Sequence, residues 1–442
     1  TMAAARETNP LCPFCENLFE EAPLLAELIK EEIGERECSR LQLGARIPKD
    51  QTEAEDHLRK RFGAGGSAPL KSSLVEEVAR HLSELGDGQN LVIDKPEILA
   101  LIDVLTLTVE LDIRSHYLYG RYRKLERGIP QTKWPCRACK GRGCEKCDNT
   151  GLQYKSSVQG LIGDPILEMF GSDEHAFHGM GREDIDVRCM GRGRPFVIEM
   201  KKPVKRNIDS EAILQAINSS AEGRIEVSDI RPSNRSEVVR IKDTPAEKSY
   251  TIRYKIEAIT ESELDVLTQV MEIPANNQDR NRRRKNHHRR KKPEPEPEAE
   301  VDLSELKKAE LVELCIEKGL AKSGTKDALI ERLSSFEEAT LPLPEAEYVM
   351  EIMTNLQGCT LAQRTPERVA HRRADKIRKR KVLETSTPSI EIDEGGNMVA
   401  EFSLRCESGT YVKETVHGDS GRTQPSIASL IKAKCTVEWL DV

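Results

Sequence analysis

Apolar residues recur three or four positions apart in three stretches of the first 104 residues. These stretches are residues 18–29, 74–85 and 98–104. Such spacing places the apolar side chains on one face of an α-helix, so the pattern predicts a helix in each stretch.

Apolar residues follow one another in short runs, or alternate with polar ones, where strands are expected. Residues 105–113 predict a buried strand, and further strands are predicted near 196–200, 224–230, 237–242 and 249–259. In the last of these, Tyr250, Ile252 and Tyr254 fall on one face. Residues 117–124 are basic and rich in tyrosine, and we expect them to form a connector.

The composition changes sharply near residue 276. Residues 276–292 include nine Lys or Arg residues, and residues 293–300 alternate Pro and Glu, a composition typical of extended, disordered chain. Behind them, residues 303–336 predict a small unit of two helices, and the strand-rich pattern resumes near 345. The sequence therefore predicts that 276–344 is an insertion within one domain.

The formal net charge is −7, yet basic residues are concentrated locally. Residues 364–381 contain nine Lys or Arg in eighteen positions. Local patches rather than the total charge decide whether phosphate is bound. No apolar run approaches the ~20 residues of a membrane helix, and no signal peptide is recognisable, so we expect a cytoplasmic protein without a membrane partner.

Three Cys-x-x-Cys pairs stand out among the twelve cysteines. In a reducing compartment such pairs indicate metal binding rather than disulfides. Two pairs have the spacing of a zinc knuckle and predict a tetrahedral structural zinc site at Cys136, Cys139, Cys144 and Cys147. The third pair, Cys12 and Cys15, either shares a zinc with one of the later pairs or is left over.

In the segment Gly181–Arg188, two arginines enclose three acidic residues, of which Asp184 lies in an Arg-x-Asp setting and Asp186 follows it. A carboxylate held beside arginines in a tight loop stays ionised at neutral pH and can act as a nucleophile. Two later segments also carry candidate chemistry: the strand beginning near Tyr250, and a glycine turn followed by Tyr411 and Lys413.

Together these three segments resemble the pseudouridine synthases, above all the archaeal and eukaryotic family that modifies uridines 54 and 55 in the T-loop of tRNA. The resemblance covers residues 155–275 and 345–442, with further likeness in 95–150. It includes the strings at 121–124, 128–134, 363–369 and 371–375.

The resemblance implies a role for each candidate residue. Asp184 would be the nucleophile because it lies in the family's Arg-x-Asp frame, with Asp186 as the second candidate, and Arg182 would contact the substrate. Tyr250 would stack on the target uracil. Lys413 would pair with the nucleophile, and Tyr411 would lie beside it in the uridine pocket. No organic cofactor is required.

The resemblance also implies a THUMP-type RNA-binding module in the N-terminal region. Tyr119, Arg121, Tyr122 and Arg123 are candidates for RNA contact there, although a charged connector is an alternative. Within 303–338, two short helices joined by a Gly-containing turn resemble a SAP motif, in which Lys322 and Lys326 would contact phosphate. We expect the basic segment to contact the tRNA backbone through Arg364, Arg368, Arg372 and Arg373.

The sequence thus predicts an α+β protein with a mixed α/β pseudouridine synthase catalytic domain built on an antiparallel sheet. The predicted parts are a zinc-bearing THUMP-type domain at 1–154, a catalytic domain split into 155–275 and 345–442, a linker at 276–302 and the SAP-like insertion at 303–338. We expect a monomer that isomerises uridine 54, 55 or both in tRNA. The alternatives are another RNA substrate, or a catalytically silent nucleic-acid-binding protein.

Overall fold

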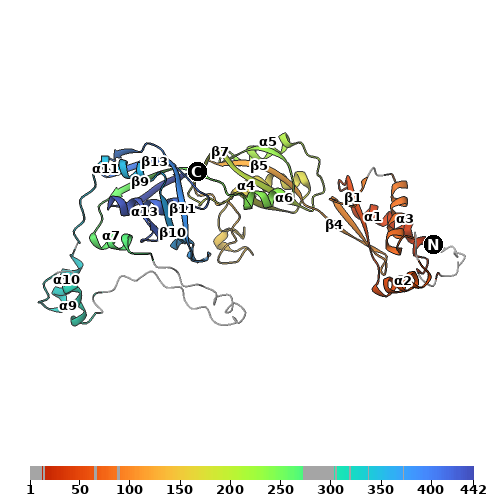
Figure 1. Ribbon diagram of the computed structural model, residues 1–442, viewed down its shortest axis with the longest axis horizontal. Coiled ribbons are helices and arrows are strands. Elements are labelled where there is room, and N and C mark those ends of the chain that lie inside the picture. The colour runs from red at the N-terminus through yellow and green to blue at the C-terminus, as the bar shows by residue number, and fades with distance from the viewer. Residues whose placement is uncertain are drawn as a thin grey trace. The chain divides into compact units, whose positions relative to one another are not determined.

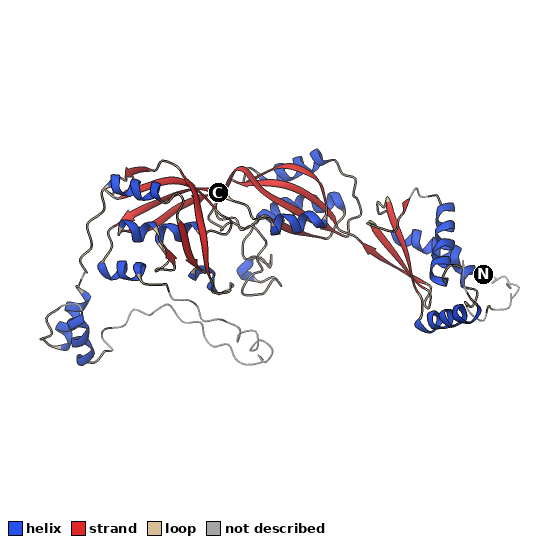
Figure 2. Ribbon diagram, in the orientation of Figure 1, coloured by secondary structure: helices blue, strands red, loops and turns tan. Residues whose placement is uncertain are grey.

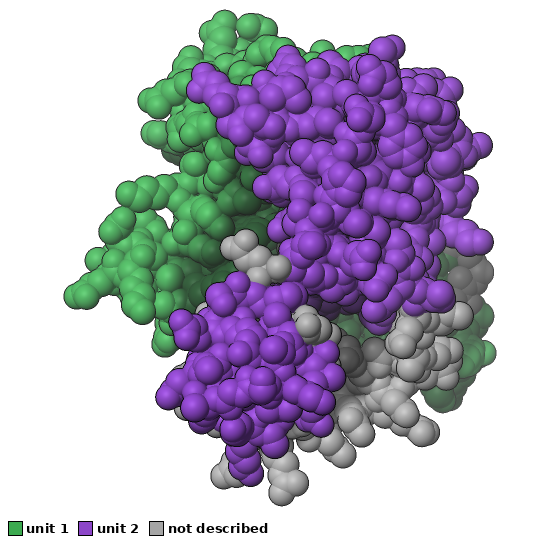
Figure 3. Space-filling view, turned by 90° about the vertical axis from the view of Figure 1, so that its left-hand side faces the viewer, with its two compact units in different colours: residues 1–244, 442 green, residues 245–441 purple. Residues whose placement is uncertain are grey.

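The computed structural model describes residues 12, 15–63, 67–86, 90–271, 303, 306–317, 320–336, 338–371 and 373–442. They form two compact units, residues 1–244 with 442 and residues 245–441, which are green and purple in Figure 3. The predicted boundary between 154 and 155 does not coincide with a boundary between these units. The predicted linker at 276–302 lies outside the described residues.

The first part of unit 1 is a four-stranded sheet with helices packed on it (Figures 1 and 2). β1 lies between β2 and β3 and runs parallel to both, whereas β4 pairs antiparallel with β3. Buried apolar residues of α1 and α3 form one core with those of β1 and β3. The elements are η1 Leu18–Glu21, α1 Ala22–Ile33, β1 Arg40–Arg46, α2 Lys49–Phe62, α3 Leu70–Glu84, β2 Asn90–Leu91, β3 Ile98–Asp103 and β4 Thr108–Ile113.

Two of the three helices predicted here are confirmed, and the third is wrong. Within this stretch Ile98–Asp103 form strand β3, in which Ile98, Ala100 and Ile102 are buried and alternate with half-buried residues. The strand predicted over 105–113 begins at Thr108, and none of its residues is buried because β4 lies at the edge of the sheet.

The second part of unit 1 is an antiparallel sheet in the order β6-β7-β5-β8. Helices α4 and α5 pack on one face, where Tyr122 and Phe196 join the core. Helix α6 packs on the other face, where Val238 and Ile241 contact Val197. The elements are β5 His116–Lys124, η2 Glu145–Cys147, α4 Val158–Phe170, β6 Glu174–Gly179, β7 Cys189–Lys201, α5 Ser210–Ala221, β8 Ile225–Ser233 and α6 Arg235–Asp243.

Two predictions for this sheet are wrong. Residues 117–124 are not a connector but the inner strand β5, and residues 237–242 belong to helix α6 rather than to a strand. Tyr122 is therefore 1% exposed and packs in the core, where RNA cannot reach it. Arg121 donates to the carbonyl oxygens of Arg192 and Gly193, both at 2.7 Å.

Unit 2 is built on an antiparallel sheet in the order β14-β10-β11-β13-β9-β15, with β12 also paired to β13. β9, from before the predicted insertion, pairs with β13 and β15 from after it. The elements are β9 Lys248–Glu257, α7 Glu261–Thr268, α11 Ala346–Asn355, β10 Thr360–Arg364, α12 Glu367–Ala370, β11 Ile377–Thr385, β12 Ser389–Ile392, β13 Met398–Cys406, α13 Val412–His417, β14 Thr423–Gln424, α14 Ile427–Ile431 and β15 Lys434–Asp441.

The helical unit predicted at 303–336 is present as α9 (Lys308–Glu317) and α10 (Lys326–Ser334). Their small core consists of Leu311, Cys315, Leu329 and Leu333. Beyond this pair the chain returns to the position it left, since the amide of Leu341 donates to the carbonyl of Ile259 at 2.7 Å.

Candidate functional site

Asp184 lies in the loop between β6 and β7 of unit 1. Along this loop the side chain of Glu183 is fully buried, Asp184 is half-buried and Asp186 is exposed. Gly181 enters the loop with φ 77°, a left-handed conformation that glycine adopts without strain. The loop thus turns one carboxylate into the protein and leaves the next one partly accessible.

The Glu183 carboxylate is the inner anchor of the loop. The hydroxyl of Tyr122 donates to it at 2.9 Å, the amide of Gln131 donates at 3.1 Å, and Arg194 Nε lies 3.0 Å from Oε2. Gln131 also donates to the carbonyl of Gly181 at 3.0 Å. Burial, with Glu183 nearby, raises the pKa of Tyr122 well above its ordinary value, so this phenol keeps its proton and remains a donor.

Lys124 anchors the loop backbone from beneath. Its side chain is fully buried, and Nζ donates to the carbonyl oxygens of Ile129 at 2.9 Å and of Asp184 and Ile185 at 3.1 Å. Burial lowers the pKa of Lys124, while the neighbouring Glu183 opposes that shift. An ammonium group has three N–H donors, so these three carbonyls use its full capacity.

Two arginines belong to the loop or contact it: Arg182, which the sequence named, and Arg127, which it did not. The guanidinium of Arg182 lies 5.2 Å from the ring centre of Trp134, within the range of a cation–π contact. Arg127 donates to the carbonyl of Asp186 at 2.8 Å. Basic and aromatic groups therefore lie around the loop that carries Asp184.

The other candidate residues for the reaction lie in unit 2. Tyr250 is half-buried on β9, where it lies opposite Leu404 of β13. Tyr411 precedes helix α13, which carries Lys413. The backbone of Tyr411 is held by the buried Gln363, which accepts from its amide and donates to its carbonyl, both at 2.9 Å.

Two arginines of the basic segment are paired with carboxylates inside unit 2. Arg364 forms a forked pair with Asp375, with a shortest distance of 2.7 Å, and Arg368 Nε lies 2.6 Å from the fully buried carboxylate of Glu414. Arg373 is exposed and donates to the Tyr411 hydroxyl at 3.4 Å. Arg372 lies outside the described residues. Arg364 and Arg368 thus have structural roles, whereas RNA contact stays a prediction for all four.

The four knuckle cysteines come together as a compact cluster. Their sulfur atoms all lie within 4.8 Å of one another, at 4.0 Å for Cys136 and Cys144, 3.9 Å for Cys139 and Cys147, and 3.7 Å for Cys144 and Cys147. Sulfur atoms placed tetrahedrally at ~2.3 Å from a zinc ion would be about 3.8 Å apart. The cluster therefore fits a four-coordinate metal ion held by thiolates.

Backbone amides also suit these cysteines to bind metal. Amides of Cys139 and Ala138 lower the pKa of Cys136. Burial raises the pKa of Cys147, but amides of Cys144 and Gly151 outweigh it and bring the value to about 7. Such donors stabilise the thiolate form that a metal requires at Cys136 and Cys147. At Cys144, burial and the neighbouring thiols instead raise the pKa to about 11.

The remaining predicted ligands and phosphate contacts lie elsewhere. Within the described ranges, Cys12 and Cys15 neighbour one another and are not part of the four-cysteine group. Lys322 is exposed in the turn before α10, and Lys326 is the first residue of that helix. Metal binding by the first pair and phosphate binding by the two lysines both stay predictions.

The anchoring roles of Tyr122, Lys124, Glu183 and Arg194 were not found from the sequence, which named Tyr122 only as a candidate for RNA contact. The sequence contained one indication of these roles. Leu118, Tyr122 and Lys124 are an even number of positions apart, so in a strand their side chains lie on the same face. A lysine at that position, on the side that enters the core, marks a buried charge that needs partners.

Comparison with known families matches two models to the chain. The model described as "Pus10, C-terminal" matches residues 117–320 and 337–442, and "Pus10 THUMP domain, archaeal" matches residues 25–103. The second match covers α1, β1, α2, α3, β2 and β3, so the first part of unit 1 is a THUMP domain. With its antiparallel sheets and helices, the protein has the predicted mixed α/β fold.

Curated relatives agree with these models. The chain is 35% identical to the tRNA pseudouridine synthase Pus10 of Methanothrix thermoacetophila over 95% of its own length and 72% of the relative. It is 32% identical to the protein of the same name from Methanothermobacter marburgensis, covering 98% and 85%, and 31% identical to that of Methanopyrus kandleri, covering 98% and 79%.

Both models and these relatives extend over nearly all of the chain. Among the described helices, none is long and apolar enough to cross a membrane. The chain belongs to the Pus10 family, whose curated members named here are tRNA pseudouridine synthases, a class of isomerases.

Proposed function

We propose that the protein isomerises uridine to pseudouridine at position 54, position 55 or both in the T-loop of tRNA. The observation that carries the proposal is the doubly anchored loop around Asp184 in a chain of the Pus10 family. Hydrogen bonds to the Glu183 carboxylate fix the residue before the candidate nucleophile. The Lys124 ammonium fixes the candidate itself by donating to the carbonyl of Asp184. A carboxylate held in this way is preorganised for attack.

The chemistry needs no oxidant, reductant or organic cofactor. The N1–C1′ bond of uridine breaks, the uracil turns, and a C5–C1′ bond forms, while C5 loses a proton and N1 gains one. Asp184 either attacks the sugar or the base covalently, or stabilises positive charge at C1′, as carboxylates do in glycoside hydrolysis. The uridine must leave its stack before any of these steps.

We assign the remaining roles from the family resemblance. Tyr250 stacks on the target uracil, Tyr411 and Arg182 contact the uridine and its backbone, and Lys413 supplies the positive charge that pairs with the nucleophile. A stacked aromatic ring and charged donors are the groups that recognise an unstacked base and its phosphates.

We further propose that the four-cysteine cluster holds a structural zinc ion. Cys136, Cys139, Cys144 and Cys147 supply four thiolates, which leaves no open position for substrate. The THUMP domain and the SAP-like helices α9 and α10 would add contacts to the tRNA, the latter through Lys322 and Lys326.

The test is to incubate the purified protein with an unmodified tRNA transcript and map pseudouridine by carbodiimide-dependent primer extension. Asp184→Ala and Asp186→Ala are tested beside it, with tRNA binding measured in parallel. We expect stops at position 54 or 55 that disappear only in Asp184→Ala, while affinity for tRNA changes by no more than a few-fold.

Each other outcome revises a different part of the proposal. Stops that persist in Asp184→Ala and vanish in Asp186→Ala would move the nucleophile to Asp186. Stops at other positions would retain the chemistry and overturn the substrate position. Binding without modification of any tRNA or other RNA would favour the catalytically silent alternative.

A further inference from the structure

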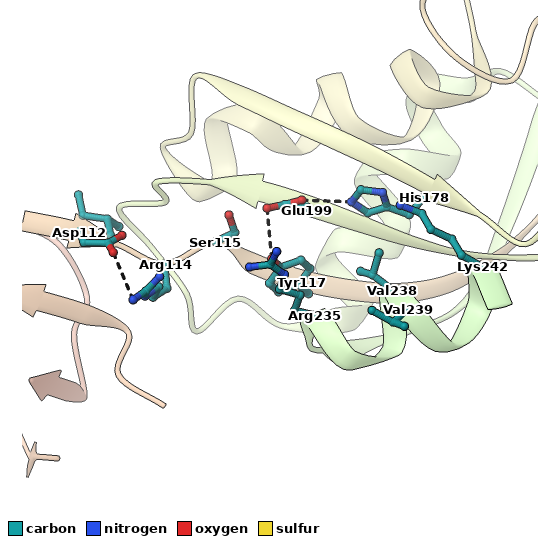
Figure 4. A pocket seen from close by; sticks show the side chains of 11 residues that line it. Asp112, Arg114, Ser115, Tyr117, His178, Glu199, Arg235, Val238, Val239 and Lys242 are labelled. Carbon is teal, nitrogen blue, oxygen red and sulfur yellow. Dashed lines mark hydrogen bonds and ion pairs between the residues drawn. The ribbon is translucent and has the colours of Figure 1, made fainter. Parts of the chain in front are cut away.

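A cavity of about 610 Å³ lies in unit 1, and no residue of the Asp184 loop lines it. It is bordered by the end of β4 and the short link to β5, by the start of β5, by β6 and β7, and by helix α6 (Figure 4). Its size falls within the ~300–1,000 Å³ typical of ligand sites. The side chains that line it decide which ligand it suits.

Helix α6 presents one face to this cavity. Arg235, Val238, Val239 and Lys242 all line it, and their positions repeat at the three-to-four-residue spacing of a helix. Arg235 and Lys242 are exposed, and in the part of the chain that the structure describes neither forms a side-chain hydrogen bond or an ion pair. Two cationic groups are thus available to a ligand.

The helix that carries these cations is held firmly. Val238 and Ile241 are buried against Val197 of β7. The buried carboxylate of Glu237, also on this helix, lies 2.8 Å from Arg231 and forms a second ion pair with Arg240. Because the helix is fixed, the backbone positions from which the Arg235 and Lys242 side chains extend are already set before a ligand binds.

The carboxylates in the cavity already have partners. Glu199 accepts a hydrogen bond from Tyr117 at 3.2 Å and lies 3.1 Å from Nε2 of His178, while Asp112 lies 3.2 Å from Arg114 (Figure 4). Three Lys or Arg side chains face two carboxylates, so the cavity has an excess of positive charge. The bond to Glu199 also fixes the half-buried ring of Tyr117.

We propose that this cavity binds a segment of the tRNA strand other than the target uridine. Arg235 and Lys242 contact phosphates, and Tyr117 offers its ring for stacking on a base. The two cationic residues are seven positions apart, about 10.5 Å along the helix axis, a span that suits successive nucleotides better than one phosphate. The inference rests on the proposed function, since it names a second contact with the same substrate.

The experiment measures equilibrium binding of full-length protein to tRNA transcript over a series of salt concentrations. Arg235→Gln/Lys242→Gln is compared with wild type and with Lys202→Gln/Lys432→Gln, which removes the same charge at exposed positions outside the cavity. Loss of two phosphate contacts lowers the slope of log K against log salt by about 1.4–1.8. The control pair leaves the slope unchanged.

A second substitution tests the stacking contact. Tyr117→Leu removes the ring and is expected to weaken binding by roughly tenfold, whereas Tyr117→Phe keeps the ring and most of the affinity. Unaltered affinity and slope in Arg235→Gln/Lys242→Gln would overturn the proposal. So would equal losses in the control pair, because the effect would then reflect net charge alone.

Binding and modification are scored separately, so this inference and the proposed function can fail independently. If wild-type protein binds tRNA without modifying it, the slope test still decides the role of the cavity. If modification occurs and the slope does not change, only the cavity proposal fails. Binding of a short polyglutamate peptide that is lost in Arg235→Gln/Lys242→Gln, with tRNA binding intact, would overturn the RNA assignment in favour of an acidic protein.

Discussion

Replacing Lys124 by methionine tests whether the loop around Asp184 must be held from beneath. Methionine has a similar length but lacks the ammonium group that donates to the carbonyl oxygens of Ile129, Asp184 and Ile185. Hydrogen bonds from a charged donor contribute about 1.5–3 kcal/mol each, so three contribute roughly 4.5–9 kcal/mol. Burying the ammonium costs several kcal/mol, which offsets part of this sum. We therefore expect the free energy of unfolding to fall by about 2–4 kcal/mol.

The effect on catalysis should be comparable to the effect on folding, since a 10²-fold loss of rate corresponds to about 2.7 kcal/mol. A displacement of about 1 Å in a catalytic group can lower the rate on the order of 10²-fold. The assay is single-turnover pseudouridine formation with tRNA saturated by enzyme, at a temperature where Lys124→Met is still folded. Amide hydrogen exchange should also accelerate at Gly128 and Val187, whose amides donate to the carbonyls of Ile185 and Asp184.

Arg206→Met is the matched control for Lys124→Met. Arg206 is also a buried cation, and it donates to the carbonyl oxygens of Arg114 at 2.6 Å and Glu97 at 3.3 Å, away from the Asp184 loop. The Arg206→Met variant should be less stable than wild type but should keep its single-turnover rate within about threefold of the wild-type rate. The reasoning is refuted if Lys124→Met reacts at the wild-type rate, or if both variants lose the same fraction of the rate.

Three further substitutions test other parts of the structure. Cys139→Ala should remove bound zinc and lower the melting temperature. Elemental analysis of the purified protein should show the loss of about one metal ion per chain. An unchanged zinc content would place the metal elsewhere. Gly163→Ala should destabilise the protein by roughly 1–3 kcal/mol in denaturant titration, because its Cβ would lie 2.4 Å from the ring of His175; a gain of stability, the usual result in a helix, would show that the ring can move. Glu237→Gln should lower stability by roughly 1–3 kcal/mol at pH 7, and the difference should vanish as the pH falls, as measured by thermal unfolding across pH. Hydrogen bonds from Arg231 lower the pKa of Glu237 to about 2. The stability that the ionised carboxylate contributes is therefore complete above the ordinary pKa of 4.5 and is lost as the pH falls from 4.5 to about 2. A stability difference between wild type and Glu237→Gln that does not change with pH would contradict this.

The sequence predicted best the segments in which periodicity and chemistry agree. The helix α3 and the strands near 196–200, 224–230 and 249–259 were all found in this way. The four-cysteine cluster was predicted from spacing alone, because short Cys-x-x-Cys loops bring their sulfur atoms together almost independently of the rest of the fold. Local sequence patterns were sufficient to predict segments in which residues close in sequence are also the ones in contact.

The strand β5 shows why other segments could not be predicted. Its inward face carries Leu118, Gly120, Tyr122 and Lys124, so only half of that face is plainly apolar. Gly120 lacks a side chain because a Cβ there would lie 2.7 Å from the ring of Phe196, and Lys124 is buried because carbonyl oxygens surround its ammonium. Both reasons depend on residues distant in sequence, which a local pattern does not contain.

The same limit applies to helix α6. Val238 and Ile241 are its only buried apolar residues, and Glu237 is buried through its ion pairs with Arg231 and Arg240. Two apolar residues and a hidden carboxylate produce no clear helical stripe, so the segment was predicted as a strand. The cavity proposed to bind RNA depends on this helix and was for that reason invisible to the sequence.

The anchoring of Asp184 breaks the usual rules for a stable core in a way that points to function. Glu183, Arg194 and Lys124 are all buried and charged, and all three contact or support one loop. Apolar residues of similar size commonly give equal or greater stability than buried ion pairs, so stability alone does not explain their presence. What they supply is a single, fixed backbone path from Gly181 to Val187, with one carboxylate turned inward and the next held at the accessible side. A reaction that breaks and remakes a glycosidic bond needs that geometry more than it needs a marginally more stable core.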